Sequence, residues 1–246
     1  MRIAVVSDIH ANLTALDAVI ADAHAVGVDI VVHAGDLMGG GARPAEVIDR
    51  IREMGWPGVF GNTDEVVWNP GLVAEKLPND QFREMRDALL AYTIPHTLAA
   101  IGDERLAWLR ALPLRWSGHD LTVVHAGPDD AWQILGAGAT DEELMRAFGR
   151  VGSSRLVYGH IHVPFVRRLP QLIVVNAGAV SLTFDGDPRA SYAVIDGDRV
   201  EIRRVAYDVE KEIALLASSD DPLRKSTIAT LRTGRYQSMD ATGGRA

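Results

Sequence analysis

The chain contains no cysteine in its 246 residues. The absence of thiols excludes disulfide bonds, Cys-ligated zinc sites and thiol nucleophiles. Positive charge is also scarce: 25 Lys and Arg face 33 Asp and Glu, which gives a formal net charge of −8. This balance argues against a protein that binds nucleic acid by electrostatic attraction, so nucleic acid is not an expected partner.

Long hydrophobic runs are missing as well. No apolar stretch approaches the roughly 20 residues that span a bilayer, so we expect no membrane partner. The first apolar run begins at Ile3 without a charged leader, and we expect no secretory signal and a cytoplasmic location. With 47% hydrophobic and 24% charged residues, the composition is that of a globular protein, which we expect to form a single domain over residues 1–246. Oligomeric state leaves no signature in the sequence.

Strand and helix patterns alternate in the first third of the chain. Continuous apolar runs at residues 3–6 and 30–32 are typical of strands buried on both faces, and a third short strand is expected at 58–60. Helices should lie between them, because Asn12 is a good N-cap and Pro44 suits a first helical turn. The intervals from Asp8 to Asp36 and from Asp36 to Asn62 are 28 and 26 residues. Each is close to the roughly 30 residues of one βαβ unit, which predicts parallel strands whose ligands emerge at one sheet edge.

The remaining elements predict a mixed architecture. Residues 65–117 form a helical insertion, with helices at 81–91 and 103–112, that either caps the site or only covers the sheet. Thr140 and Glu143 form a capping box for another helix. Further strands are expected at residues 121–124, 155–158, 165–168, 172–175, 190–195 and 200–205, the last four in antiparallel pairs. C-terminal helices near 209–217 and 222–232 and a frayed tail of about a dozen residues complete the region 208–246. We predict an α/β fold, a four-layer α-β-β-α sandwich of two mixed sheets flanked by helices.

Seven polar residues follow short apolar runs in the strings SDIH, AGDL, GNTD, VVHAG and YGHIH: Asp8, His10, Asp36, Asn62, His125, His160 and His162. Four imidazoles, two carboxylates and one amide suffice to hold two transition-metal ions with open positions for water and phosphate. In an extended segment residues i and i+2 face the same way, so Asp8 and His10 should grip one ion together. A carboxylate has two oxygens, so Asp36 is suited to bridge two ions.

These five strings, in this order over roughly residues 3–178, resemble those of calcineurin-like metallophosphoesterases, in particular the small prokaryotic phosphodiesterases. The resemblance implies one ion on Asp8, His10 and His162, a second ion on Asn62, His125 and His160, and Asp36 bridging them. The identity of the two divalent ions stays open, because such nitrogen and oxygen ligands suit manganese, zinc, iron, cobalt and nickel alike. The resemblance also implies hydrolysis of a small-molecule phosphoester, most readily a phosphodiester, by a water whose pKa the metals lower.

One position departs from the family pattern. Many members have a histidine directly after the Gly-Asn pair, where it stabilises the transition state or protonates the leaving oxygen. Here that position is Thr63, which cannot act as a proton donor near neutral pH. Asn62, Thr63 and Asp64 are the predicted catalytic residues: the first two by hydrogen bonding, and Asp64 by orienting a ligand unless it only caps a turn. Substrates with good leaving groups should therefore be favoured.

Other readings stay open. A phosphomonoesterase and a dinucleoside polyphosphate hydrolase share the same metal chemistry. A catalytically weak scaffold with this fold, as in a retromer subunit, is the alternative from another class, although seven intact ligands weigh against it. His33 is either structural or a contact of the Asp36 ligand, and the segment Asn176-Ala177-Gly178 resembles a family motif with a structural role.

Overall fold

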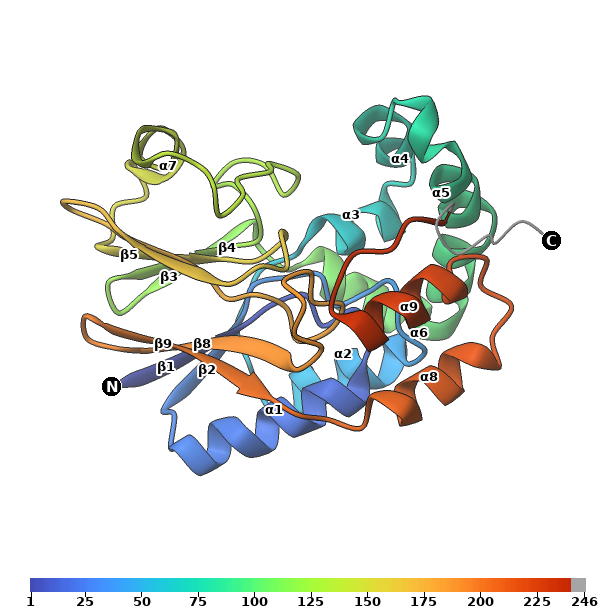
Figure 1. The fold of residues 1–246 in the computed structure, drawn as a ribbon, viewed down its shortest axis with the longest axis horizontal. Coiled ribbons are helices and arrows are strands. Elements are labelled where there is room, and N and C mark those ends of the chain that lie inside the picture. The colour runs from blue at the N-terminus through green and yellow to red at the C-terminus, as the bar shows by residue number, and fades with distance from the viewer. Residues whose placement is uncertain (240–246) are drawn as a thin grey trace.

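The computed structural model describes residues 1–239, in which two β-sheets pack face to face (Figure 1). The first sheet consists of β1 (Arg2–Val6), β2 (Ile30–His33), β8 (Ala190–Asp196) and β9 (Arg199–Val205), in the order β2-β1-β8-β9. The second consists of β3 (Arg115–Gly118), β4 (Leu121–Val124), β5 (Arg155–Tyr158), β6 (Phe165–Arg168) and β7 (Ile173–Asn176), in the order β3-β4-β5-β7-β6. Both sheets are mixed, because β1 runs parallel to β2 and antiparallel to β8, and β5 runs parallel to β4 and β7 while β3 and β6 are antiparallel.

Strand β1 shows how the layers arise, because its side chains alternate between two cores. Ile3 and Val5 belong to the core between the sheets. Ala4 and Val6 belong to the core beneath helices α1 (Leu13–Val26) and α2 (Pro44–Glu53). The outer face of the second sheet packs against α7 (Asp141–Phe148) in a third core. The predicted four-layer α-β-β-α sandwich is confirmed.

The helical insertion begins three residues earlier than predicted and contains more helices. It comprises α3 (Asn62–Trp68), α4 (Gly71–Lys76), a 3₁₀ turn (Asp80–Phe82), α5 (Arg83–Ala88), a π-helical turn (Leu89–Thr93) and α6 (Ile94–Arg110). The helix predicted at 81–91 is therefore three short pieces, and the one at 103–112 is the second half of α6. Gly102, with φ 65° and ψ 176°, interrupts α6 and hides its first half from sequence periodicity.

Helices α8 (Val209–Ala217) and α9 (Arg224–Thr233) follow the β8–β9 hairpin of the first sheet and lie beside the insertion at the right of Figure 1. Residues 240–246 of the expected tail lie outside the described residues. Within residues 1–239, no helix is both long enough and apolar enough to span a bilayer.

The prediction of a strand at residues 58–60 is wrong. Only one parallel bridge forms there, between His33 and Gly58. Phe60 donates its N–H to the Pro113 carbonyl instead, so the pairing with β2 does not continue beyond Val59. Strand β3 was missed in turn, because its sequence Arg-Trp-Ser-Gly has no apolar alternation. The predicted helix starts are confirmed: the Asn12 side chain accepts the Ala15 N–H at 2.9 Å, and the Thr140–Glu143 capping box is present.

His33 is buried in this fold with neither ring nitrogen hydrogen-bonded. Its ring lies 6.3 Å from that of Trp108, and it makes no hydrogen bond to Asp36. His33 is thus a structural residue, and burial lowers its pKa from 6.5 to about 4.

We predict that His33 makes the protein acid-sensitive. Between pH 6.5 and about 4 the unfolded chain binds a proton at His33 that the folded chain excludes. The free energy of unfolding therefore has its full value above pH 6.5 and decreases as the pH falls through this range. At 1.36 kcal/mol per pH unit the full loss is about 3 kcal/mol. Urea unfolding of His33→Leu from pH 4 to 7 should show a shallower decline than the parent protein. Equal slopes would contradict the prediction.

Candidate metal centre

Six of the seven predicted ligands come from the ends of parallel strand pairs in both sheets. Asp8 and His10 follow β1, and Asp36 follows β2. His125 directly follows β4, and His160 and His162 follow β5. Asn62 is the first residue of α3. The carboxyl ends of these strands meet at one side of the sandwich, which is where open α/β sheets place their ligand sites.

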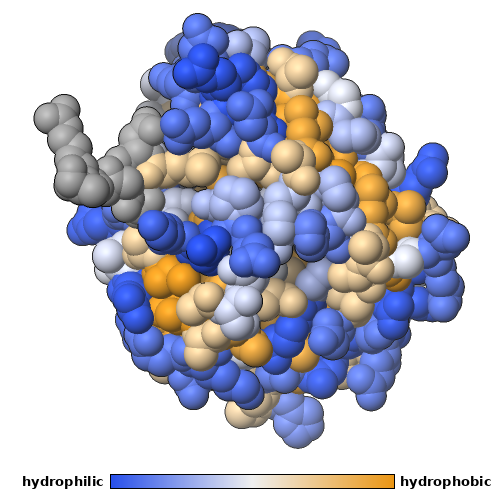
Figure 2. All heavy atoms as spheres, turned by 90° about the vertical axis from the view of Figure 1, so that its right-hand side faces the viewer, coloured by the Kyte–Doolittle hydropathy of each residue, from blue (hydrophilic) through white to orange (hydrophobic). Residues whose placement is uncertain are grey.

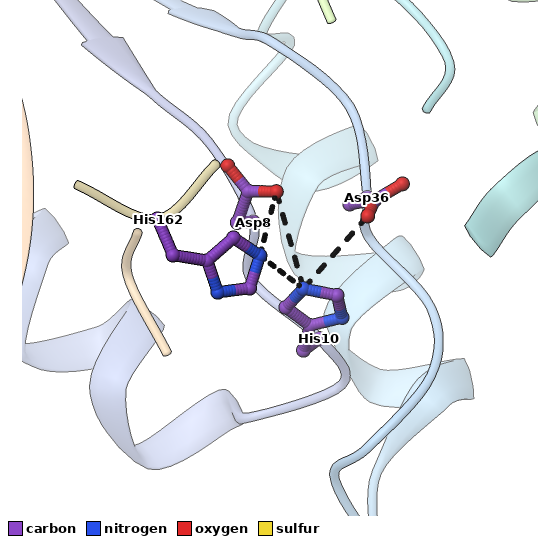
Figure 3. A group of neighbouring side chains, drawn as sticks. All are labelled: Asp8, His10, Asp36 and His162. Carbon is purple, nitrogen blue, oxygen red and sulfur yellow. Dashed lines mark hydrogen bonds and ion pairs between the residues drawn. The ribbon is translucent and has the colours of Figure 1, made fainter. Parts of the chain in front are cut away.

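The donor atoms gather in two clusters that share one residue. Asp8, His10, Asp36 and His162 form the first cluster, with donor atoms within 4.8 Å of one another (Figure 3). Asp36, His125 and His160 form the second. The Asn62 Oδ1 lies 2.9 Å from the Nε2 of His125, beside this second cluster. The structure therefore brings all seven residues together, in the two groups that the resemblance implied.

Three histidines are oriented in the same way by the backbone. In each, the Nδ1 atom lies within hydrogen-bond distance of a carbonyl oxygen. His10 Nδ1 is 3.1 and 3.0 Å from the carbonyls of Met38 and Gly39. His125 Nδ1 is 2.8 Å from that of Ala34, and His162 Nδ1 is 2.5 Å from that of Leu182. A carbonyl can only accept, so each Nδ1 carries a hydrogen, and the neutral form of each ring directs an Nε2 lone pair into the site. This is the arrangement by which proteins fix metal-binding imidazoles.

These lone pairs face other acceptors at close range. The Nε2 atoms of His10 and His162 are 3.1 Å apart, and the Nε2 of His162 is 3.2 Å from Asp8 Oδ1 (Figure 3). The Nε2 of His125 is 3.3 Å from Asp36 Oδ1. Buried acceptors that face one another repel unless a proton or a cation lies between them. The donor set therefore fits bound cations.

Protons and cations compete for the same lone pairs. Burial lowers the pKa of His10, and His162 lowers it further. Burial, then His125, lowers the pKa of His160 to about 4, so this ring is neutral at physiological pH. Burial also opposes the charge on His162, yet the nearby Asp8 carboxylate raises its pKa. Burial would raise the pKa of Asp8, but His162 and the other imidazoles hold it well below its usual range.

The backbone around the ligands is not extended, contrary to the i, i+2 reasoning from sequence. Five of the ligands have φ between 50° and 66°, a backbone conformation that residues other than glycine rarely adopt: Asp8, His10, Asp36, His160 and His162. Hydrogen bonds between the loops hold this geometry: Asp8 N–H donates to the Gly35 carbonyl at 3.0 Å, and His10 N–H to that of Asp36 at 3.0 Å. Such strain is typical of sites that the surrounding structure fixes in place.

Two of the glycines that precede ligands are required by close approach. A Cβ on Gly159 would lie 1.8 Å from the Ser7 Oγ and 2.4 Å from Asp8 Oδ2. A Cβ on Gly61 would lie 2.1 Å from Asp36 Oδ1. The loops after different strands can therefore interdigitate around the carboxylates only because these positions have no side chain.

A supporting loop was missed from the sequence. Residues 180–184 donate hydrogen bonds from the Val180 and Ser181 amides to the carbonyls of Ser7 and Asp8 at 2.9 and 3.0 Å. The same loop supplies the Leu182 carbonyl to His162, and Phe184 stacks on that ring at 4.3 Å. These contacts use mainly backbone atoms, which carry no residue-type signal.

The end of β7 also supports the metal centre. Asn176 Nδ2 donates to the Gly159 carbonyl at 2.6 Å, and its Oδ1 accepts the Gly178 amide at 2.9 Å. Asn176 thereby fixes the residue that directly precedes His160. These contacts support the structural role expected for this motif.

The predicted catalytic residues Thr63 and Asp64 point toward the protein backbone. The Thr63 hydroxyl donates to the Met38 carbonyl at 2.8 Å, and its N–H donates to Asp36 Oδ1 at 2.9 Å. Asp64 is buried and accepts the amides of Leu37, Met38 and Gly61 at 2.9 to 3.0 Å. Burial, then Asp36, raises the pKa of Asp64 to about 7. Asp64 thus holds the loop after Asp36 and the start of α3 through their backbone amides.

The sequence model of the calcineurin-like phosphoesterase superfamily domain matches residues 1–199. The chain belongs to this superfamily. Membership implies hydrolysis of phosphoesters with bound divalent metal ions.

Similar proteins cover nearly the whole chain. An uncharacterized protein of Methanocaldococcus jannaschii is 32% identical over 232 residues, which are 85% of this chain and 89% of that protein. The crystal structure of a metallophosphoesterase from Sphaerobacter thermophilus is 30% identical, with a TM-score of 0.77, and covers 95% of this chain and 99% of its own. A hypothetical protein from Pyrococcus horikoshii, 19% identical, shares the fold with a TM-score of 0.77 over 95% and 98% of the two chains.

We predict that the chain binds two divalent ions. Elemental analysis of protein reconstituted with manganese or zinc should give two ions per chain, because the ligands form two clusters. His125→Ala should retain the first cluster and bind one ion, while circular dichroism stays that of the folded protein. One ion or none in the parent protein would contradict the two-metal centre.

We also predict that Gly159→Ala loses metal without a change in any ligand. The added methyl group must displace Ser7 and Asp8, so metal affinity should fall at least tenfold and stability by about 1–3 kcal/mol. Gly138→Ala is the matched control, because nothing lies within 4 Å of its added carbon. Calorimetric metal titration and urea unfolding measure both effects. Parent-like metal affinity in Gly159→Ala would contradict the close-approach argument.

Proposed function

We propose that this protein is a dinuclear metal-dependent phosphodiesterase that hydrolyses a small-molecule phosphodiester. The observation that supports it most directly is Asp36, whose carboxylate belongs to both clusters. A carboxylate in this position can bridge two ions, and phosphoester hydrolases of this type use such pairs.

The roles of the residues follow from their positions. Bound divalent ions would supply Lewis acidity to the phosphoryl group and a water of lowered pKa. Asp8, His10, His162, Asn62, His125 and His160 would hold them, and Asp36 would bridge. Thr63 and Asp64 act as positioning residues, the first through its N–H on Asp36 and the second through the backbone of residues 37 and 38.

Charge supports a diester as the substrate. The proposed ligand set has two carboxylates, which offset half of the charge of two divalent ions, and its imidazoles and amide are neutral ligands. With a hydroxide nucleophile counted for both substrates, the charges of such a site would sum to zero for a phosphodiester and to −1 for a monoester dianion. Strongly uncompensated charge is unfavourable in a buried site.

The surroundings of Thr63 support substrates with good leaving groups. Its hydroxyl already donates to the Met38 carbonyl, and the Asp64 carboxylate faces backbone amides, so neither side chain presents a proton to a leaving oxygen. A leaving group of low pKa departs without that assistance. A phosphomonoesterase or a dinucleoside polyphosphate hydrolase is the alternative if such selectivity is absent, and a scaffold is the alternative if hydrolysis is absent.

We predict that Thr63→His extends activity to poor leaving groups. In the metal-loaded parent protein, kcat/KM should be higher for an activated aryl diester than for an unactivated alkyl monoester. The added imidazole should raise kcat/KM for unactivated esters about tenfold or more and should change kcat/KM for the activated ester much less.

Thr63→Val is the control, because it removes the hydroxyl without adding an acid and should leave the ratio of the two activities unchanged. A parent protein that prefers unactivated monoesters would contradict the phosphodiesterase proposal. Absence of hydrolysis across all esters in protein that holds two ions would favour the scaffold.

A further inference from the structure

A pocket of about 280 Å³ adjoins the metal centre and is walled mainly by the insertion and by α9. His10, Asn62 and Thr63 line the end next to the metal clusters. The opposite walls come from α3 to α6 and from α9, on the side of the molecule that faces the viewer in Figure 2, where hydrophobic side chains reach the surface among hydrophilic ones. The insertion therefore does more than cover the sheet: it borders the predicted site.

The pocket carries no fixed charge on its described walls. Among its lining residues within 1–239 there is no Asp, Glu, Lys or Arg, whereas a neighbouring pocket behind Gly39–Gly41 contains Arg43 and Asp221. A polyphosphate chain needs cations along its length, and a nucleoside needs directed polar partners. The uncharged pocket does not suit a polyphosphate chain. Some hydroxyl and amide side chains line it, but about half of its lining is aliphatic or aromatic, from Val66 and Val67 to Trp132 and Phe184, which suits a hydrocarbon group.

The apolar walls are built independently of any ligand. Val66, Val73 and Ile94 form a buried cluster of their own, with Leu89 packed against it. Trp132, from the loop after β4, donates its indole N–H to Glu65 at 2.9 Å, which fixes the ring beside this cluster. A pre-formed apolar pocket binds a complementary group without the entropy loss of ordering its walls.

We propose that the substrate carries an apolar aryl or alkyl group that occupies this pocket while its phosphate lies at the metal centre. This inference rests on the proposed function for the location of the phosphate. The volume lies near the lower end of the roughly 300–1,000 Å³ found for small-molecule sites, so the group is of modest size. The pocket thereby selects for the organic part of the substrate, and the metal centre selects for its phosphate.

Binding of alkylphosphonates tests this assignment without catalysis. Methylphosphonate and hexylphosphonate present the same phosphonate group, so their calorimetric affinities for protein loaded with two ions differ only through the alkyl chain. Each fully buried methylene corresponds to about a fourfold gain in affinity. Partial burial of the chain should make hexylphosphonate bind at least tenfold more tightly.

Two adjacent leucines provide a matched pair of variants. Leu89 lines the pocket, whereas Leu90 is 43% exposed and does not line it. Leu89→Gln should lower the affinity for hexylphosphonate fivefold or more and leave the affinity for methylphosphonate within about twofold of the parent value. Leu90→Gln should change neither affinity. Leu89→Ala serves as the milder variant if the first one unfolds, and it should show the same selective loss.

The outcomes separate this inference from the proposed function. Equal affinities of the two phosphonates would overturn the pocket assignment, while hydrolysis of phosphodiesters would still support the function. Equal losses in the Leu89 and Leu90 variants would also overturn it, because the alkyl chain would then bind elsewhere. Failure of both phosphonates to bind protein that holds two ions would overturn the pocket assignment and the proposed function together.

Discussion

The convergence of buried lone pairs is the constraint on which the rest of this structure depends. Three imidazoles are turned by backbone carbonyls so that their Nε2 atoms face carboxylates and one another within 3.3 Å. Such a centre is unfavourable in an apolar interior unless positive charge compensates it. The left-handed backbone at five of the ligands, the glycines without room for a methyl group and the loop of residues 180–184 all maintain this one arrangement.

The strain is tolerated because two sheets hold the loops from opposite sides. Strand β1 contributes to the core between the sheets and to the core beneath α1 and α2, so the loop that carries Asp8 begins from a strand buried on both faces. His125 and His160 begin from the second sheet, which is anchored by α7. A metal centre at the junction of the layers is thus rigid without needing regular structure at the ligands themselves.

Much of this could be predicted from the sequence, and the reason differs between elements. The ligand set was predictable because each residue follows an apolar run and its chemistry is specific to its residue type. The prediction of a strand at 58–60 was wrong because Phe60 hydrogen-bonds to a carbonyl distant in the sequence. Helices α3 and α4 were not predicted because helices of six or seven residues show too little periodicity. The orientation of His162 by Leu182 was invisible because a carbonyl is present in every residue.

Helix α3 joins the two halves of the site in a single element. Its first residue is Asn62, at the second cluster, and Val66 and Val67, about one turn later, line the apolar pocket. An occupant of the pocket that displaces this helix must change the affinity of the second cluster for its ion. By thermodynamic reciprocity, that ion must change the affinity of the pocket for its occupant by the same factor. Metal availability would then tune substrate selection as well as turnover.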